Sequence, residues 1–270
     1  MTVAVITGGA SGFGLALGER CAANGFNVAL LDRDGVRAEA EAKSLAEAHD
    51  VETLGLSADV ADNGAVVAAA AAVAERFGGA DLVISNVGVQ LFGAVDRLTE
   101  AEWNWVLDVN VTGSARVAQA FLPLLRQAPK GRLAFTTSAS VLDPASRMAA
   151  YQASKFAVWG LAETLRLELA DDGIGVTVIF PSGMITRHLE TSGDAQPEAI
   201  ARPVADGEDF AAMMKSNPDM TLAVVPPEEA AARVVDAILN DEPYVVTHGD
   251  LVLAVDRRSA LLRTAAEAGR

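Results

Sequence analysis

A tyrosine and a lysine stand four residues apart in "AAYQASKFAV", a segment made mostly of small and apolar residues. On a helix, residues with this spacing share one face, so Tyr151 and Lys155 would project side by side. A free tyrosine has a pKa of about 10, and its use as a base costs about 1.36 kcal/mol for each pKa unit above ambient pH. A neighbouring ammonium lowers that cost. The pair is therefore suited to proton exchange with a substrate hydroxyl, and chance pairing is the alternative.

A glycine-rich turn follows the first predicted strand, in "TGGASGFG". Gly8, Gly12 and Gly14 have a TGxxxGxG spacing, and the third glycine opens a predicted helix. Such a turn lets backbone N–H groups and the positive end of a helix approach a pyrophosphate closely. Ser11 and Phe13 belong to the same turn and are counted among the expected ligand contacts. The alternative is a tight strand-to-helix turn without a ligand.

An acidic residue ends the second predicted strand, in "NVALLD". Asp32 follows Gly14 at close to the offset of roughly 20 residues at which a carboxylate reaches the ribose 2′-hydroxyl of a dinucleotide. A carboxylate there repels a 2′-phosphate, and the glycine turn contains no Lys or Arg to bind one. These residues favour NAD over NADP. Arg33 complicates the choice, because its guanidinium could swing toward a 2′-phosphate; its alternative role is a solvated loop charge.

The elements that must position these residues alternate between strands and helices. Short runs rich in β-branched residues, without in/out alternation, are typical of strands covered on both faces. The predicted strands are 3–7, 27–32, 53–60, 81–86, 132–138, 176–181 and 244–248. Predicted helices begin near Gly12, Arg37, Asp62, Glu100 and Tyr151, and another covers 226–241. With right-handed crossovers, this order predicts an α/β fold of the Rossmann type: a doubly wound, mostly parallel sheet of seven strands with helices on both faces.

The chain is expected to form a single domain over residues 1–270. Its hydrophobic content of 51% can supply the core of one domain of ordinary enzyme size. No repeat, linker or shift in composition divides it. The less regular stretch 187–222 interrupts the strand-helix alternation, and its length predicts a lid over a site.

Composition excludes several classes of function. The formal charge of -15 and the lack of a basic stripe argue against nucleic acid as a partner. The single cysteine, Cys21, excludes an internal disulfide, and with no secretory signal pattern a cytoplasmic location is expected. The alanine-rich run 65–77 is shorter than the roughly 20 apolar residues a bilayer needs, so no membrane association is expected. The histidines, His49, His188 and His248, lack the spacing of metal ligands, so no metal site is predicted.

Several short motifs follow one another along the chain. They are "TGGASGFG", "ADV" at 58–60, "SNVG" at 85–88, "DVNVTG" at 108–113, Ser138, "YQASK" at 151–155 and "PSGMIT" at 181–186. Their order and spacing resemble those of short-chain dehydrogenases/reductases, and the resemblance covers Thr2 to His248. It implies a catalytic set of Asn110, Ser138, Tyr151 and Lys155. Tyr151 would be the acid/base, Lys155 its cationic partner, Ser138 the hydroxyl that orients the substrate oxygen, and Asn110 part of a proton relay.

The resemblance also implies contacts with a nicotinamide dinucleotide. Asp59 and Val60 would contact adenine, Asn86 and Gly88 would line the cofactor at a strand end, and Thr186 would hold the nicotinamide carboxamide. The complete predicted cofactor-binding set is Gly8, Ser11, Gly12, Phe13, Gly14, Asp32, Arg33, Asp59, Val60, Asn86, Gly88, Tyr151, Lys155, Pro181, Met184 and Thr186.

The chain departs from the family pattern at two motifs. Ser85 and Val87 replace residues of the usual "NNAG", and Ser182 replaces the glycine of the usual Pro-Gly. Neither change removes a reacting group. Ser182 adds a hydroxyl and a stiffer backbone on the nicotinamide side, which leaves the shape of the substrate site open.

Ser138 and Asn110 have less support from the residues alone. Ser138 ends a predicted parallel strand at its carboxyl side, where open α/β sheets bind ligands, so its hydroxyl can donate to a carbonyl oxygen that becomes negative during reduction. Capping the strand end is the alternative for Ser138, and Ser140 is the reserve candidate. Asn110 lies in a helical pattern, where asparagine usually faces solvent, and without the resemblance it would be assigned a structural role.

These observations predict an NAD(H)-dependent oxidoreductase that interconverts a secondary alcohol and a ketone. Apolar candidates for the pocket favour a bulky hydrophobic small-molecule substrate, such as an aromatic alcohol or a steroid; they are Val141, Leu142, Met148, Met184, Met213 and Met214. The alternative is an NAD-binding sensor or scaffold with little turnover, although such a protein has no need for the serine, tyrosine, lysine and asparagine set.

The resemblance further implies a homotetramer or dimer joined through 100–127 and 151–171. Candidate interface residues, for which core burial is the alternative, are Phe156, Val158, Trp159 and Leu161.

Overall fold

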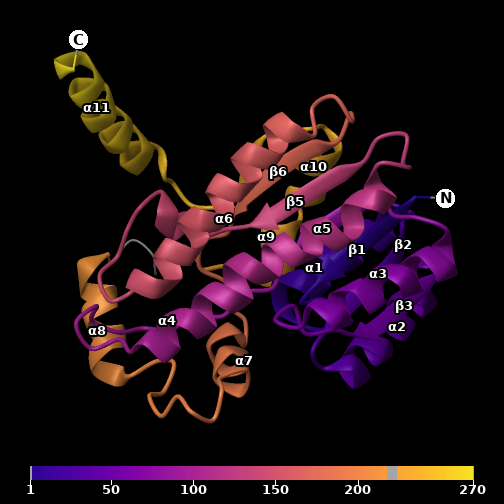
Figure 1. Ribbon diagram of the computed structural model, residues 1–270, viewed down its shortest axis with the longest axis horizontal. Helices are drawn as coiled ribbons and strands as arrows, with labels where there is room; N and C mark the ends of the chain where they lie inside the picture. Colours follow the sequence, from indigo (N-terminus) through magenta and orange to yellow (C-terminus); the bar gives the residue numbers. More distant parts are fainter. Residues whose placement is uncertain (1, 218–223, 270) are drawn as a thin grey trace.

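Seven strands form one parallel sheet in the part of the chain that the computed structural model describes, residues 2–217 and 224–269 (Figure 1). The order across the sheet is β3-β2-β1-β4-β5-β6-β7. The bounds are β1 Val3–Thr7, β2 Asn27–Asp32, β3 Thr53–Ser57, β4 Leu82–Ser85, β5 Arg132–Thr136, β6 Gly175–Phe180 and β7 Tyr244–Val246. The predicted doubly wound α/β sheet is confirmed.

The third strand is shorter than predicted. It ends at Ser57, because the Asp59 carboxylate accepts a hydrogen bond from the Ala61 N–H at 2.8 Å and the chain turns there. The order of the strands also reverses between β1 and β4, so the loops that follow these two strands leave in opposite directions. This divergence opens a crevice at the carboxyl ends of the strands.

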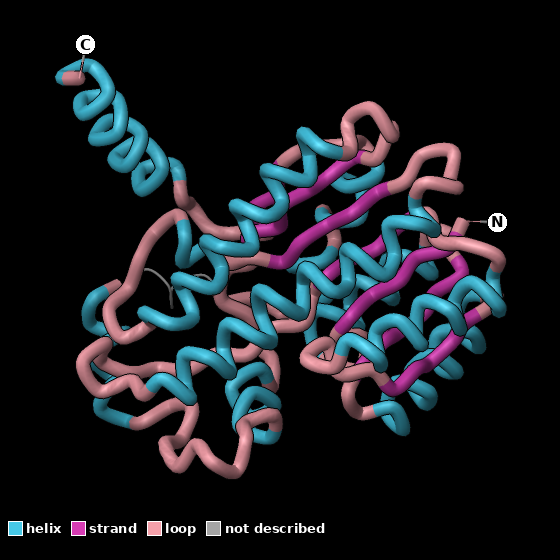
Figure 2. The backbone as a smooth tube through the Cα atoms, in the orientation of Figure 1, coloured by secondary structure: helices cyan, strands magenta, loops and turns pink. Residues whose placement is uncertain are grey.

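Helices cover both faces of the sheet (Figure 2). Their bounds are α1 Gly12–Ala23, α2 Gly35–His49, α3 Asn63–Phe77, α4 Glu100–Leu107, α5 Gly113–Leu125, α6 Ala149–Glu168, α7 His188–Asp194, α8 Gly207–Ser216, α9 Pro227–Ala231, α10 Val234–Leu239 and α11 Val252–Ala268. A π-helix, η1, covers Asp108–Thr112, and a 3-10 turn, η2, covers Ala139–Val141.

Side-chain caps set several helix starts within two residues of the predicted ones. The Asp34 carboxylate accepts a hydrogen bond from the Arg37 N–H at 3.0 Å, so α2 begins at Gly35. Asp62 caps α3, and Thr99 forms a reciprocal capping box with Glu102 at the start of α4. The helix predicted over 226–241 is divided into α9 and α10. Helix α11 was not predicted; it extends away from the sheet and buries none of its residues (Figure 1).

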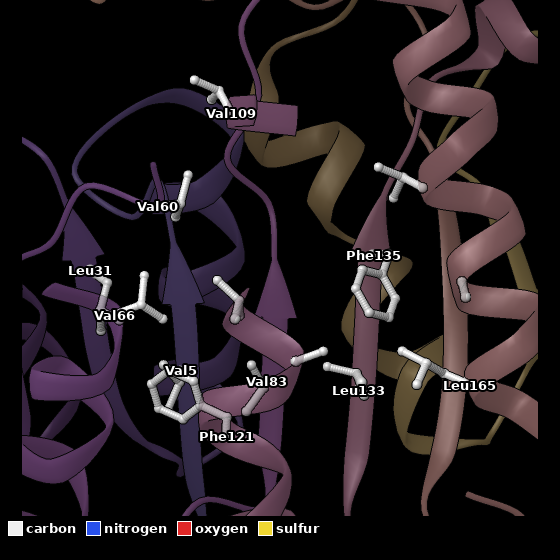
Figure 3. Close-up of a cluster of buried hydrophobic side chains, with 14 of the residues drawn as sticks. Val5, Leu31, Val60, Val66, Val83, Val109, Phe121, Leu133, Phe135 and Leu165 are labelled. Atoms are coloured by element: carbon white, nitrogen blue, oxygen red, sulfur yellow. The ribbon is translucent and has the colours of Figure 1, made fainter. Parts of the chain in front are cut away.

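Alternate residues of each central strand enter two different cores. Val5 of β1 packs in the larger core with Val83 of β4 and Phe121 of α5, as Figure 3 shows. Ile6, the next residue of β1, lies in the second core with Leu17 of α1. Complete burial of such a side chain stabilises the fold by about 1.5–3 kcal/mol. The two cores therefore hold the strand ends, and the loops that follow them, in place.

The structure bears on membrane-spanning helices, metal ligands and the single cysteine. No helix of the described chain is long and apolar enough to cross a membrane, and no three His, Cys, Asp or Glu residues within it are gathered as metal ligands. Cys21 is buried in the second core, where burial raises the pKa of its thiol to about 12.

The predicted lid segment contains two helices, α7 and α8, up to Asn217; residues 218–222 of that prediction lie outside the described residues. Its backbone is joined to the body where the Phe92 N–H donates to the Val204 carbonyl at 2.9 Å. The segment also carries Asp209, whose side chain is wholly buried. Together these contacts make α8 an integral part of the fold.

Asp209 is surrounded by three arginines. Its carboxylate lies 2.5 Å from Arg97 Nη2, 3.6 Å from Arg147 Nε and 3.4 Å from Arg202 Nη1. Arg202 also pairs with the buried carboxylate of Glu102 at 3.0 Å. Arg147 lies two residues before Ala149, the first residue of α6, and it has a left-handed φ of 65°. The cluster thus ties α8 to the segment before α4 and to the entrance of α6.

We predict that Asp209→Asn lowers the free energy of unfolding by about 3 kcal/mol, because it leaves the three guanidinium groups without their buried carboxylate. Denaturant unfolding at neutral pH measures the change. The control is Glu47→Gln, which removes an exposed ion pair with Lys43 and should leave stability unchanged. Equal stability of the wild type and Asp209→Asn would contradict the assignment.

Candidate active site

The conformation of the turn after β1 requires glycine at several positions. Gly8 and Gly12 have φ values of +65° and +52°, in the left-handed region that favours glycine. A Cβ on Gly14 would lie 2.0 Å from the Gly8 carbonyl oxygen, so α1 starts in direct contact with this turn. The backbone of the turn and the first turn of α1 line an open space, an arrangement suited to phosphate groups.

A cavity of about 1340 Å³ lies at the carboxyl ends of the strands. Every predicted cofactor-binding residue lines it, from Gly8 of the glycine turn to Thr186 before α7. Ser138 lines it as well, together with Tyr151 and Lys155, whereas Asn110 does not. Its size exceeds that of an ordinary small-molecule pocket, and it has room for a dinucleotide beside a substrate.

Two carboxylates and two guanidinium groups line the cavity beside the end of β2, on Asp32, Asp34, Arg33 and Arg37. The Asp32 carboxylate accepts hydrogen bonds from the N–H groups of Ala10 and Asp34, both at 3.1 Å, which hold it beside the glycine turn. Arg33 reaches across to donate to the Asp194 carbonyl of α7 at 2.8 Å. Arg37 also lines the cavity and was not predicted. The charge that would meet a ribose is therefore mixed.

Tyr151, Ser138 and Lys155 come together at the other end, each less than one-tenth exposed. Lys155 Nζ lies 5.7 Å from the centroid of the Tyr151 ring and donates to the Thr136 carbonyl at 3.0 Å. A Cβ on Gly88 would lie 2.8 Å from this Nζ atom, so glycine makes room for the ammonium. The helical spacing predicted for the pair is confirmed by α6.

Burial governs the protonation of these groups. It raises the pKa of Tyr151 above its ordinary value, and the hydrogen bond with Ser138 offsets part of that rise. It lowers the pKa of Lys155 to about 8, so the ammonium remains mostly charged at neutral pH. The sequence predicted a lowered Tyr151 pKa; the direction is opposite because desolvation of the phenol outweighs its polar contacts.

Ser138 has a neighbour that fixes its hydroxyl. Ser140 donates to Ser138 Oγ twice, from its hydroxyl at 2.9 Å and from its backbone N–H at 3.2 Å. Gln152 in turn donates to the Ser140 carbonyl at 2.6 Å. With both lone pairs of its oxygen occupied, the Ser138 hydroxyl hydrogen is left to be donated elsewhere. Ser140 also lines the cavity, so the structure brings both serines to the site.

Asn110 is completely buried behind the cavity, within the π-helix η1. Its side chain accepts from the Val89 N–H at 2.7 Å and donates to the Val89 carbonyl at 2.9 Å. It also donates to Ser154 Oγ at 2.9 Å, and Ser154 lies on α6 beside Lys155. The solvent-facing position typical of a helical asparagine is therefore wrong for this residue, because its amide replaces a backbone partner for Val89.

The opposite wall of the cavity is apolar. Met148, Met184, Met213 and Met214 line it as predicted, whereas Val141 and Leu142 do not. Val141 is buried in the larger core and Leu142 packs against it, because the short helical turn η2 directs them there.

Sequence reasoning missed several other residues that line the cavity. They are Gln90, Phe92, His188, Leu189 and Phe210. Phe92 and Phe210 meet edge to face with ring centroids 5.4 Å apart, close to the Met213 side chain. Gln90 and Phe92 could have been found from the "SNVG" motif, because they lie two and four residues after its end. Leu189 and Phe210 carry no such signal, because the path of the lid segment is set by distant contacts.

Comparison with known proteins places this geometry in context. The family model of short chain dehydrogenases matches residues 2–197. A 3-dehydrosphinganine reductase of Arabidopsis thaliana is 37% identical over 202 residues, which is 73% of this chain and 60% of that protein. The chain thus spans less than two thirds of that relative. A D-threitol dehydrogenase of Mycolicibacterium smegmatis is 30% identical over 251 residues, 93% of this chain and 90% of that protein.

Solved structures give the same picture. A short chain dehydrogenase/reductase from Burkholderia phymatum in complex with NAD has a TM-score of 0.87 at 29% identity, covering 98% of this chain and 95% of that one. An alcohol dehydrogenase from the archaeon Thermococcus sibiricus, complexed with 5-hydroxy-NADP, has a TM-score of 0.74 at 26% identity, covering 91% and 95%. The match over most of the chain, together with the sheet order and the glycine turn, shows that this chain belongs to the short-chain dehydrogenase/reductase family.

Proposed function

We propose that the protein is an NAD(H)-dependent oxidoreductase that interconverts a secondary alcohol and a ketone. The observation that carries the proposal is the meeting of Tyr151, Ser138 and Lys155 at one end of a cavity whose other end is a glycine turn. A nicotinamide dinucleotide, when bound, supplies or accepts the hydride. The names of the two relatives, a reductase and a dehydrogenase, support the same class of reaction.

The residues that would hold the dinucleotide run the length of the cavity. The turn Gly8–Gly14, with Ser11 and Phe13, fits the pyrophosphate, because the backbone of the turn and the start of α1 line the cavity. Asp32 would accept hydrogen bonds from a ribose, and Asp59 and Val60 would meet the adenine. The nicotinamide end would be held by Asn86, Gly88, Pro181, Met184, Thr186 and the Lys155 ammonium.

The proton chemistry belongs to Ser138 and Tyr151. Ser138 would donate its hydroxyl hydrogen to the substrate oxygen, since Ser140 already occupies the acceptor side of that hydroxyl. Tyr151 would give its proton to the forming alkoxide in reduction and take it back in oxidation. Lys155 would favour the phenolate form of Tyr151, because its positive charge lies a few ångströms from the ring in a site shielded from water.

Asn110 would act mainly by holding the site together. Its side chain joins Val89, in the loop after β4, to Ser154 on α6. Both segments carry residues of the cavity wall. A part in carrying protons from Lys155 toward water, implied by the family, belongs to the same proposal.

NAD is the preferred cofactor in this proposal. The Asp32 carboxylate is held beside the glycine turn, where it would repel a 2′-phosphate. Arg33 is engaged with Asp194, which reduces its freedom to bind such a phosphate. The relatives include complexes with NAD and with an NADP derivative, so the choice depends on these residues of the chain itself.

The apolar wall supports a hydrophobic substrate, in the size range of an aromatic alcohol or a steroid.

A homotetramer or dimer, joined through α4, α5 and α6, also belongs to the proposal. Of its predicted interface residues, Phe156 is 41% exposed, whereas Val158 is 1% exposed and is assigned to the core. A cytoplasmic location is proposed from the single cysteine.

We predict that Tyr151→Phe lowers kcat by about 10²- to 10⁴-fold, the usual contribution of a general acid, with little change in the Kd of NADH. Steady-state assays and fluorescence titration measure the two quantities. Tyr244→Phe is a matched control, because Tyr244 lies on β7 with its hydroxyl on Glu163. Unchanged turnover in Tyr151→Phe would remove Tyr151 from the mechanism. A protein that binds NADH but turns over no alcohol or ketone would instead revive the sensor or scaffold alternative.

We predict that Asp32→Ser lowers the preference for NADH over NADPH by about tenfold or more, which corresponds to about 1.4 kcal/mol. Separate titrations with the two cofactors measure it. Asp62→Ser is the control, because serine keeps the cap of α3 and Asp62 does not line the cavity. A wild type that prefers NADPH, and loses that preference in Arg33→Ala, would show that Arg33 governs the ribose site.

We predict that the wild type gains stability relative to Lys155→Met as pH rises from 8 to 10.5. The pKa of Lys155 is lowered from 10.5 to about 8 by burial, so in this window the unfolded chain binds the proton and the folded chain does not. The relative gain is at most about 3 kcal/mol. Denaturant unfolding across this range measures it, with Lys43→Met as the exposed control. Parallel curves for the wild type and Lys155→Met would contradict the burial of a charged amine.

A further inference from the structure

Among the polar side chains that line the cavity without a side-chain hydrogen bond to a described residue, two belong to backbones joined by one buried hydroxyl. They are the amide of Gln90, which follows β4, and the imidazole of His188, the first residue of α7. Most polar side chains of the site have partners: Ser138, Lys155 and Asn110 are all hydrogen-bonded. Polar groups that line a pocket without a partner are available to a ligand.

A single buried hydroxyl holds the two residues beside each other. Ser192 Oγ accepts a hydrogen bond from the Gln90 N–H at 3.1 Å and donates one to the His188 carbonyl at 2.7 Å. Ser192 is 1% exposed. Gln90 and His188 are far apart in the sequence, but this bridge fixes their backbones beside each other.

The pair lines the same cavity as the reacting groups. The Lys155 ammonium is near enough to His188 to affect its titration. Leu189, the residue after His188, packs against the apolar cluster that contains Met213 and Tyr151 itself. A substrate with its carbonyl at Tyr151 would therefore place its apolar part against this cluster, in the cavity that the pair also lines.

The charges of the pair restrict what it can bind. Burial, with the Lys155 charge, lowers the pKa of His188 to about 4, so the imidazole is neutral at physiological pH. Arg187 beside it is engaged with Glu190 at 2.6 Å. A neutral amide and a neutral imidazole offer a donor and an acceptor without net charge, which suits a hydroxyl better than a carboxylate or an ammonium.

We propose that Gln90 and His188 form a hydroxyl-binding subsite, so that the preferred substrates are ketones with a hydroxyl close to the carbonyl and an apolar remainder. This inference rests on the proposed function, and it names the substrate class of the same site. The hydroxyl would donate to one of the two side chains and accept from the other, while Ser138 and Tyr151 serve the carbonyl oxygen.

The test compares two ketones that differ by one hydroxyl: a methyl ketone with a straight alkyl chain, and the hydroxymethyl ketone with the same chain. Reduction of each by NADH is measured for the wild type, Gln90→Leu, His188→Leu and the conservative His188→Gln. Glu190→Gln, on the same helix but outside the cavity, is the control. Melting temperatures establish that each variant is folded.

In the wild type, kcat/KM for the hydroxymethyl ketone should exceed that for the methyl ketone by at least tenfold. The ratio should fall toward one in Gln90→Leu and His188→Leu, recover in part in His188→Gln and stay unchanged in Glu190→Gln. Equal reduction of both ketones by the wild type, or a ratio that survives in both leucine variants, overturns the subsite and leaves the proposed function intact. Failure to reduce either ketone with NADH or NADPH overturns the proposed function, and the subsite with it.

Discussion

The burial of one ammonium group constrains much of this structure. Lys155 Nζ lies inside the protein with a single carbonyl, that of Thr136, as its hydrogen-bond acceptor among the described residues. Two neighbouring residues make room for the ammonium and hold the backbone around it. Gly88 leaves the volume that the amine occupies, and Asn110 holds the neighbouring loop after β4. A charge in such surroundings interacts strongly with whatever lies next to it, because little water screens it. Positions that look like ordinary packing thus serve to keep one charged atom beside one phenol.

The sheet and most of the site could be predicted from the sequence, since both depend on local patterns. Buried strands are recognisable as apolar runs. The glycine spacing is required by the close approach of α1 to β1. The Tyr151–Lys155 pair needs only helical geometry. The exact ends of elements depended on side-chain caps such as Asp34, which periodicity does not reveal. The direction of the Tyr151 pKa shift was mistaken, because desolvation is a property of the whole fold. The environments of Asn110 and Val141 likewise depended on local helix geometry that the sequence pattern concealed.

The segment between β6 and α9 is the part of the fold for which the sequence gives the least detail. Its irregular composition predicts a lid, and this stays a prediction; its described part is held by a backbone hydrogen bond to Phe92 and by the buried Asp209 carboxylate. The arginines around Asp209 belong to the segment before α4, to the entrance of α6 and to the segment itself. The ion-pair cluster could not be predicted from any one of these segments, because its charged residues come from distant parts of the chain. The apolar wall of the cavity thereby shares a support with the helix that carries Tyr151.

Helix α11 has the opposite relation to the fold. None of its residues is buried, and Arg258 is its visible link to the body, through the Val141 carbonyl and the face of the Phe156 ring. Its helical state must therefore come largely from the intrinsic preferences of its alanine, leucine and arginine residues. A segment of this kind melts independently of the cooperative unit that contains the sheet. Substitutions in its outer turns should consequently leave the folding equilibrium of the sheet unaltered, whereas Leu253, Ala254 and Arg257 in its first turns line the cavity and belong to the site.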